Sequence, residues 1–293
     1  MTQRVAVVTD SSSCLPPEVA DAWGIDVVPL YAVVDGEARP EGEPGLTADV
    51  ERGMRTGSRV TTSQPSLGEC LEAFEHAAAR AESVVAITLS AGMSGTHGVM
   101  ELAAAQMGGR VTVVDSRTVS LATGFAALSA AAAAREGAPA DAVAREAVRV
   151  ARSSLCLFTV ESLEYLRRGG RVSPAVAAMG QALMIRPVLG VVAGEVGVVD
   201  RVRTATRART AMLDRVGSRA RALRTPVLGL MRMPSDALLE TEARDILARR
   251  GRWPVLSAEL SAVLAAHTGP GTLAAVVADV SPEVAASLVV PSL

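Results

Sequence analysis

Short apolar runs alternate with longer helical patterns through the first half of the chain. The short runs are rich in Val and Ile, whereas the longer segments repeat apolar residues every three or four positions. This alternation predicts a parallel sheet with helices on both faces. Strands are expected at 4–8, 83–89 and 110–114, helices at 69–81, 94–107 and 119–135, and a Gly-, Pro- and Glu-rich surface loop at 35–47.

Each of these predicted strands is followed by a cluster of small polar residues, at 9–13, 90–96 and 115–116. The carboxyl ends of parallel strands lie along one edge of a sheet, and ligands bind at that edge. We therefore expect the three clusters to lie close together near a ligand site.

The pattern changes after a helical run at 140–152 and an apolar run at 155–160. Beyond it, Gly194-Glu195 links two strand-like segments, which predicts a hairpin. We therefore expect an α/β protein with an N-terminal parallel-sheet domain at 1–158 and a second α/β domain with a mixed sheet at 159–293. In the second domain, helices are expected at 174–185, 205–223 and 234–250, and strands at 187–193, 196–202, 226–231, 255–260 and 273–280.

The charge balance excludes several classes of function. The chain has 29 basic and 31 acidic residues, so no general field attracts nucleic acid. It contains no lysine, which excludes a P-loop lysine and a Schiff-base lysine. With 49% hydrophobic residues, the composition favours a small neutral or amphiphilic ligand, and we expect neither a cofactor nor a nucleic-acid partner.

The cysteine and histidine positions argue against a metal site. Cys14, Cys70 and Cys156 are far apart and form no Cys-x-x-Cys pair, which predicts reduced core residues in a cytoplasmic protein. The first predicted strand begins so early that it leaves no room for a signal peptide, which agrees with a cytoplasmic location. His76 and His97 do not match any metal-ligand spacing, so no metal is expected.

Two stretches rich in hydroxyl groups are candidates for binding a polar head group. Residues 61–66, Thr-Thr-Ser-Gln-Pro-Ser, place hydroxyls and free amides before a helix start, where an anion is favoured. In 90–97, Ser94 either caps the next helix or binds a ligand oxygen beside glycines that allow a close approach. An ordinary helix cap explains either stretch equally simply.

Three further candidates carry charge or a titratable group. Arg171 after two glycines and Arg186 before a proline suit carboxylate or phosphate recognition, although a solvated surface arginine is the commoner case. His267 before Thr-Gly-Pro-Gly predicts a rigid loop that presents an imidazole, or a histidine that caps a turn. The arginine-rich run 201–224 is a solvated helix face or a docking surface for an acidic partner.

Taken in order, a series of short motifs resembles the DegV family across nearly the whole chain. The motifs are Val8-Thr-Asp-Ser11 with Leu15-Pro16, Thr62-Ser-Gln-Pro-Ser66, Ser94-Gly-Thr96, Asp115-Ser116, Leu163-Glu-Tyr-Leu166 with Gly169-Gly-Arg171, Arg186-Pro187 and His267-Thr-Gly-Pro-Gly271. The resemblance implies a two-domain DegV fold that binds one long-chain fatty acid in an apolar tunnel between its domains.

The resemblance also implies a role in phospholipid synthesis. Members of the family called FakB proteins are the fatty-acid-binding subunits of a bacterial fatty acid kinase. They present the carboxylate to a separate kinase subunit, which makes the acyl phosphate from ATP. The chain is then a lipid-binding carrier without catalytic residues of its own, and a transient contact with the membrane is expected.

Residue by residue, the resemblance implies that Thr62 and Ser94 bind the fatty acid carboxylate. Ser63, Gly95 and Thr96 belong to the same two motifs, and His267 is expected near the same carboxylate. Arg171, Arg203 and Arg207 are expected to face the kinase subunit. The sequence departs from the family at Met93 and His97, where leucine and an aromatic residue are more usual, and at Arg186, where lysine is usual.

Two other functions remain as alternatives. Ser94 is the candidate nucleophile of a serine esterase, although its surroundings lack the second glycine of a Gly-x-Ser-x-Gly elbow. The chain is also compatible with a carrier of another amphiphilic ligand.

Overall fold

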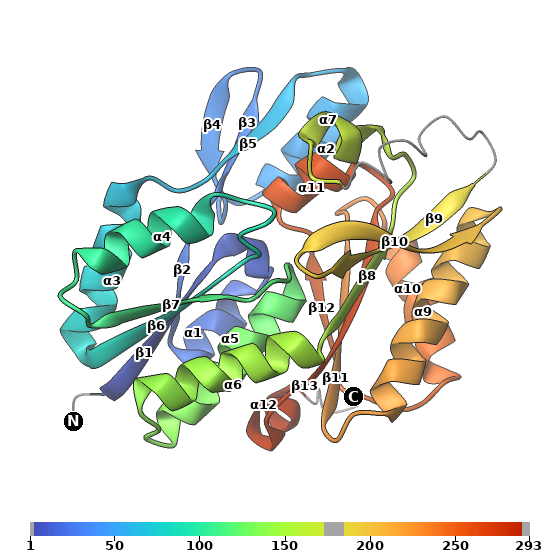
Figure 1. Cartoon of the computed structure of the whole chain (residues 1–293). Coiled ribbons are helices and arrows are strands. Elements are labelled where there is room, and N and C mark those ends of the chain that lie inside the picture. Colours follow the sequence, from blue (N-terminus) through green and yellow to red (C-terminus); the bar gives the residue numbers. More distant parts are fainter. Residues whose placement is uncertain (1–2, 173–184, 289–293) are drawn as a thin grey trace.

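The computed structural model describes residues 3–172 and 185–288, and in this part the strands form three sheets (Figure 1). The first sheet contains β1 (Gln3–Asp10), β2 (Ile25–Val28), β6 (Ala81–Thr88) and β7 (Val111–Asp115). The second contains β8 (Leu155–Thr159), β9 (Arg186–Val192), β10 (Glu195–Val202), β11 (Pro226–Arg232), β12 (Val255–Glu259) and β13 (Leu273–Asp279). The third contains β3 (Tyr31–Val34), β4 (Glu37–Pro40) and β5 (Val60–Ser63).

The sheet topologies confirm the predicted mixed α/β class. The four-stranded sheet has the order β2-β1-β6-β7, and all its strand pairs are parallel. The six-stranded sheet has the order β10-β9-β8-β13-β11-β12 and is mixed, because only β11 and β12 run parallel. The predicted hairpin at Gly194-Glu195 is confirmed by the antiparallel pair of β9 and β10.

Helices cover the sheets as the apolar pattern predicts. They are α1 (Pro17–Trp23), α2 (Leu46–Thr56), α3 (Leu67–Arg80), α4 (Thr96–Ala105), α5 (Leu121–Arg135), α6 (Ala140–Ser153), α7 (Glu164–Gly169), α9 (Ala205–Arg221), α10 (Ala237–Ala248), α11 (Ala262–Thr268) and α12 (Pro282–Ser287), with a 3-10 turn at Ser11–Ser13. Side chains of β1 alternate between the two faces of its sheet, so that Val5 and Val7 pack toward α5 while Ala6 and Val8 pack toward α3 and α4.

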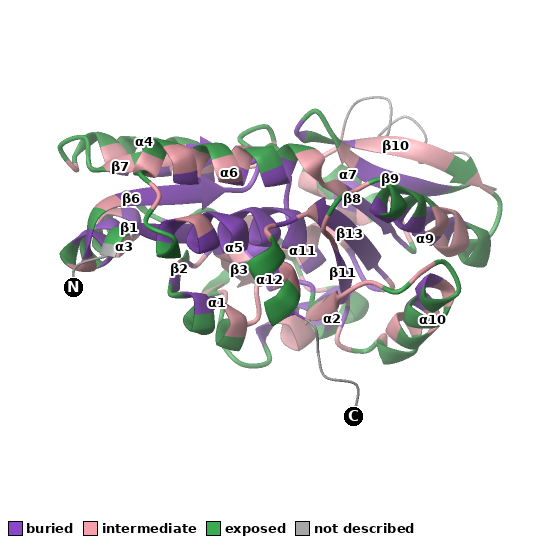
Figure 2. Ribbon diagram, turned by 90° about the horizontal axis from the view of Figure 1, so that it is seen from below, coloured by how far each residue is buried: buried purple, intermediate pink, exposed green. Residues whose placement is uncertain are grey.

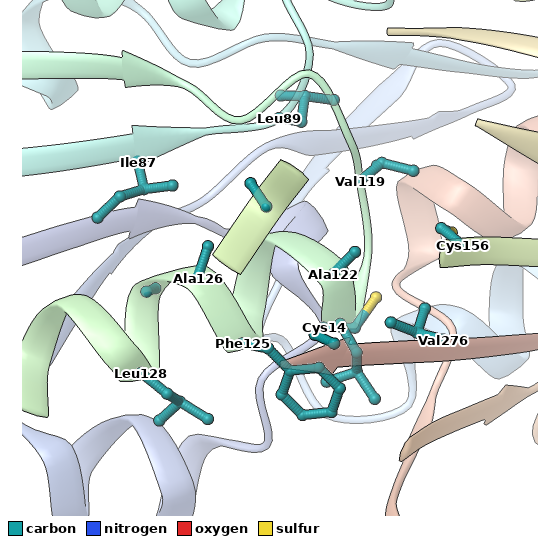
Figure 3. Packing of buried hydrophobic residues seen from close by; sticks show 14 of the residues in the cluster. Cys14, Ile87, Leu89, Val119, Ala122, Phe125, Ala126, Leu128, Cys156 and Val276 are labelled. Atoms are coloured by element: carbon teal, nitrogen blue, oxygen red, sulfur yellow. The ribbon is translucent and has the colours of Figure 1, made fainter. Parts of the chain in front are cut away.

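Helix α5 lies between the two larger sheets and is buried on all sides (Figure 2). Its alanine-rich sequence lets both sheets approach closely, and Figure 3 shows Ala122 and Phe125 in one cluster with Ile87 of β6 and Val276 of β13. One continuous core therefore joins the two halves of the molecule.

The segment predicted as a surface loop at 35–47 is largely exposed and has turns at 41–45, but it also contains a strand and the start of a helix. Residues 37–40 form β4, and α2 begins at Leu46. Asp35 and Gly36 both have positive φ, which is the geometry of a tight hairpin turn, and they join β3 to β4. The polar composition of the segment concealed this hairpin.

Two other predictions fall outside what the structure decides. The helix predicted at 174–185 lies almost wholly outside the described residues. Strand β8 pairs with β9 and β13, so it belongs to the six-stranded sheet, while the domain division after residue 158 stays a prediction.

Among the described residues, no helix combines the length and apolar character needed to cross a membrane.

Candidate functional site

A cavity of about 320 Å³ opens where the three sheets meet. Its apolar lining includes Leu89 after β6, Val119 before α5, Phe158 on β8, Val196 on β10 and Ala274 on β13. Residues that are far apart in sequence therefore form one apolar wall.

Most of the predicted ligand-binding residues line this cavity. Those that line it are Thr62, Ser63, Ser94, Gly95 and His267, and Arg171, which was expected to face a kinase subunit, lines it too. Thr96 does not line it, but its hydroxyl lies 2.9 Å from that of Ser94. Three residues depart from the family pattern. Met93 lines the cavity, His97 lies outside it and contacts Thr88, and Arg186 lies outside it and donates to the carbonyl of Glu161.

Thr62 and His267 form the best-defined pair of the site. Thr62 lies on β5 opposite Ala32 and is partly buried, while its neighbours Thr61 and Ser63 are exposed. Its Oγ1 lies 2.9 Å from Nε2 of His267. His267 stands in the last turn of α11, so the prediction that this histidine sits in a rigid loop is wrong; the helix continues one residue beyond it.

The surroundings of His267 keep its imidazole neutral. Burial and the nearby Arg171 lower the pKa of His267 from its usual 6.5 to about 4. Its Nδ1 atom is buried and has no hydrogen-bond partner among the described residues. Gly169 packs against this atom, since a Cβ on Gly169 would lie 2.2 Å from Nδ1.

This geometry assigns the tautomer of His267. A buried N–H without an acceptor is costly, so the proton belongs on Nε2, which donates to Thr62 Oγ1. The hydroxyl hydrogen of Thr62 is then free to donate to another acceptor. The imidazole thus leaves Thr62, which lines the cavity, with an available hydrogen-bond donor.

Ser94 is held by Thr96 at the start of α4. Its Oγ accepts a hydrogen bond from the backbone N–H of Thr96 at 3.2 Å. The N-cap position of α4 is Gly95, so Ser94 precedes the cap. Gln64 lies directly over Gly95, because a Cβ on this glycine would come within 2.1 Å of Gln64 Oε1.

Arg171 places a positive charge at the rim of the cavity. Its side chain is exposed, and its Nη1 donates to the carbonyl of Gly169 at 2.6 Å. Its Nε donates to the carbonyl of Met93 at 3.4 Å. The guanidinium therefore spans from the end of α7 to the loop that carries Ser94.

The polar clusters at the strand ends do meet, as predicted. Asp10 at the end of β1 is fully buried, and its Oδ2 accepts from the N–H of Leu89 at 2.7 Å. Asp115 at the end of β7 accepts from the N–H of Ala91 at 3.2 Å. Burial raises the pKa of Asp10 to about 6. These carboxyl groups fix the loop that leads to Ser94.

Some lining residues escaped the reading of the sequence. Gln64 and Thr268 lie inside the motifs at 61–66 and 267–271, so a signal for both existed. Ser120, Cys156 and Thr272 also line the cavity, and no local pattern marks them as ligand-binding residues.

Arg203 and Arg207 stand apart from the cavity. Both are exposed, and Arg207 belongs to the first turn of α9. Neither lines the cavity, so the structure does not bring them together with Thr62 and Ser94.

The arrangement gives no support to a serine esterase. A nucleophilic serine needs a base within hydrogen-bond reach. In the described part of the chain, Ser94 Oγ contacts Thr96, whereas His267 Nε2 contacts Thr62.

The three cysteines are buried and free of disulfides.

Comparisons with known proteins agree on one family. The model of the DegV family, an uncharacterised protein family, matches residues 4–280. A DegV domain-containing protein of Streptomyces coelicolor is 35% identical over 286 residues, which cover 95% of this chain and 100% of that protein. A DegV domain-containing protein of Mycobacterium bovis is 35% identical over 277 residues, which cover 92% of this chain and 95% of its own.

Solved structures of similar proteins share the fold. One concerns fatty acid binding of a DegV family protein from Thermus thermophilus; it has a TM-score of 0.86 and 33% identity, and the match covers 94% of this chain and 100% of that chain. Another is DegV from Bacillus subtilis, described as a fatty acid binding protein, with a TM-score of 0.84, 25% identity, and coverage of 95% of this chain and 100% of that chain.

Proposed function

The chain belongs to the DegV family, and we propose that it binds a long-chain fatty acid in the cavity with the carboxylate at Thr62 and Ser94. The observation that carries this proposal is the cavity itself, which has apolar walls and bears neutral hydroxyl groups on residues of β5 and of the loop before α4. The fatty acid binding described for the similar proteins from Thermus thermophilus and Bacillus subtilis supports it.

The division of labour between tail and head follows from energetics. Each buried methylene contributes about 0.8 kcal/mol, so the tail supplies most of the affinity. The hydroxyls of Thr62 and Ser94 orient the carboxylate without neutralising its charge. A carboxylate held in this way keeps its nucleophilic character.

We further propose that the protein presents this carboxylate to a separate ATP-dependent kinase subunit. A carboxylate oxygen would attack the γ-phosphorus of ATP, an O–P bond would form, and the bond to the leaving ADP would break, giving an acyl phosphate. Arg171 at the rim supports this, since a guanidinium there suits a transferring phosphoryl group. The exposed Arg203 and Arg207 are the candidate contacts with the kinase subunit.

Binding of stearic acid to the delipidated protein tests the first proposal. Thr62→Val removes the donor and should weaken binding roughly tenfold or more, as expected for a hydrogen bond to a charged group. Thr62→Ser should retain binding. Thr61→Val is the matched control, because Thr61 is the exposed neighbour on the same strand.

Octadecanol, which lacks the carboxylate, separates head-group recognition from tail burial. Octadecanol should bind the wild type more weakly than stearic acid does. Its affinity for Thr62→Val should equal its affinity for the wild type. The proposal fails if the wild type binds no fatty acid, or if the alcohol binds as tightly as the acid. Mass spectrometry of material extracted from the purified protein then identifies any other amphiphile.

Phosphoryl transfer from ATP in the presence of a fatty acid kinase subunit tests the second proposal. Arg203→Glu and Arg207→Glu should slow acyl phosphate formation and leave stearic acid affinity unchanged, because neither residue lines the cavity. Arg224→Glu, at an exposed position beyond the far end of α9, is the control. Equal rates for all three variants would refute the assigned contact surface.

A further inference from the structure

The cavity contains a polar pair separate from the residues that hold the carboxylate. Ser120 precedes α5 and Cys156 lies on β8, and both line the same cavity. Neither belongs to the elements that carry Thr62, Ser94 and His267.

The hydroxyl of Ser120 is poorly satisfied for a buried group. Ser120 is 3% exposed. Among the described residues, its Oγ contacts Cys156 Sγ at 3.6 Å. Sulfur is a weak hydrogen-bond partner. Burial raises the pKa of the Cys156 thiol to about 11, so the sulfur is uncharged at neutral pH and does not compensate.

Two other hydroxyl-bearing residues of the cavity wall, Thr268 and Thr272, are satisfied internally. Thr268 Oγ1 donates to the carbonyl of Leu264 at 2.9 Å, and Thr272 Oγ1 donates to the carbonyl of Gly269 at 2.7 Å. These two hydroxyls therefore already donate to backbone carbonyls. Ser120 differs from both.

Ser120 also does not act as a helix cap, although it occupies the N-cap position of α5. Ser66, Ser261 and Ser281 occupy the same position in other helices, and each accepts from a backbone amide of the first turn. At α5 there is no side-chain cap. Ser120 has φ of 62°, a strained value for a residue other than glycine, and in this conformation the residue lines the cavity.

We infer that the cavity selects an acyl chain that carries an oxygen substituent, a hydroxyl or keto group, which hydrogen-bonds to Ser120. An unsubstituted chain would bury the Ser120 hydroxyl against methylene groups and leave it with the sulfur contact, which costs free energy. An oxygen on the chain satisfies it, and Cys156 adds a second weak donor. This inference rests on the proposed fatty acid binding and names the class of fatty acid.

Competition between stearic acid and a series of hydroxystearic acids, with the hydroxyl at successive carbons, tests the inference. The wild type should bind at least one hydroxy isomer roughly fivefold more tightly than stearic acid, as expected for one net hydrogen bond. Ser120→Ala should abolish that preference and leave stearic acid binding equal or tighter. Thr268→Val is the control, because it alters a cavity hydroxyl that is already satisfied.

A second variant covers a folding failure of Ser120→Ala. Ser120→Gly removes the same hydroxyl and relieves the positive φ, so it should fold at least as well as the wild type and should also lose the preference.

The outcomes separate the two proposals. If stearic acid binds and no hydroxy isomer binds more tightly, the inference is overturned while the proposed function stands. A preference that survives in both Ser120 variants likewise overturns it. If neither class of acid binds, the proposed function itself fails.

Discussion

The imidazole of His267, whose Nε2 lies 2.9 Å from Thr62 Oγ1, is neutral in the folded protein at neutral pH. Because the folded pKa of His267 is about 4 and the usual value is 6.5, only the unfolded chain takes up this proton between pH 6.5 and pH 4. This proton uptake lowers stability as the pH falls through that window. His267→Gln should remove this pH dependence, which lowers the wild-type stability by roughly 3 kcal/mol between pH 7 and pH 4.

Denaturant unfolding of both proteins at pH 7, 5.5 and 4 measures this effect. The buried Asp10 has a raised pKa and contributes the opposite slope below pH 6, but it is present in both proteins and cancels in the difference. Parallel stability curves for wild type and His267→Gln would contradict the neutral imidazole.

Gly169 is required because its missing side chain leaves room for His267. In Gly169→Ala, the new Cβ would lie 2.2 Å from Nδ1 and would push the imidazole away from Thr62. We expect a destabilisation of about 1–3 kcal/mol, as for other overpacked sites, together with weaker stearic acid binding. Gly98→Ala in α4, where a Cβ meets nothing within 4 Å, should lower neither stability nor stearic acid affinity, as measured by denaturant unfolding and titration.

At the residue scale, the sequence could indicate the residues proposed to bind the head group and could not indicate those proposed to contact the acyl chain. Thr62 and Ser94 stand in short polar motifs that interrupt apolar runs, so local patterns mark them. Ser120 and Cys156 meet across 36 positions of the chain, and each looks like an ordinary small residue in its own segment. They come together because α5 packs against β13, which pairs with β8.

At the scale of elements, the short helix α11 controls the site because it carries Val263, Leu264 and His267 to the cavity. Its start is held by the side chain of Ser261, which accepts from Leu264 N at 3.3 Å, and by Glu41, which accepts from Val263 N at 2.7 Å. The cavity wall therefore depends on a helix cap.

Ser261→Ala and Ser281→Ala form a matched pair that tests this dependence. Both serines are N-caps with similar geometry, since Ser281 accepts from Val284 N at 3.4 Å in α12. Each variant should lose about 1 kcal/mol of stability. Stearic acid affinity should fall only in Ser261→Ala, and an equal loss of affinity in both variants would show that α11 has no special role.

The periodicity of the sequence could predict the larger elements but not the small sheet. Strands β1, β6 and β7 are apolar runs between amphipathic or apolar helices. The type of these elements and their succession along the chain could therefore be predicted. Strands β3, β4 and β5 have four residues each, which is too short for a period to emerge. The helix α11 was obscured by the Gly-Pro-Gly that follows it, which drew attention to a loop.

At the scale of the molecule, the cavity belongs to both halves of the fold, because β5 and β6 lead to one side of it and β8, β10 and β13 form the other. Strand order and the burial of α5 between two sheets are consequences of long-range pairing, such as β8 with β13. No local window of the sequence contains both partners of such a pair. This is why the sequence indicated two domains but not the shared core between them.

The shared core leads to a prediction about ligand-linked unfolding. A fatty acid that contacts both halves stabilises both at once, so the delipidated protein should unfold in a single calorimetric transition that moves as a whole when stearic acid is added. At a free ligand concentration of 100 times Kd, the stabilisation should be about 2.7 kcal/mol. Thr62→Val should require a higher concentration for the same shift, because its Kd is larger. Two transitions, of which only one responds to stearic acid, would mean that the halves unfold independently and that the continuous packing around α5 does not couple them.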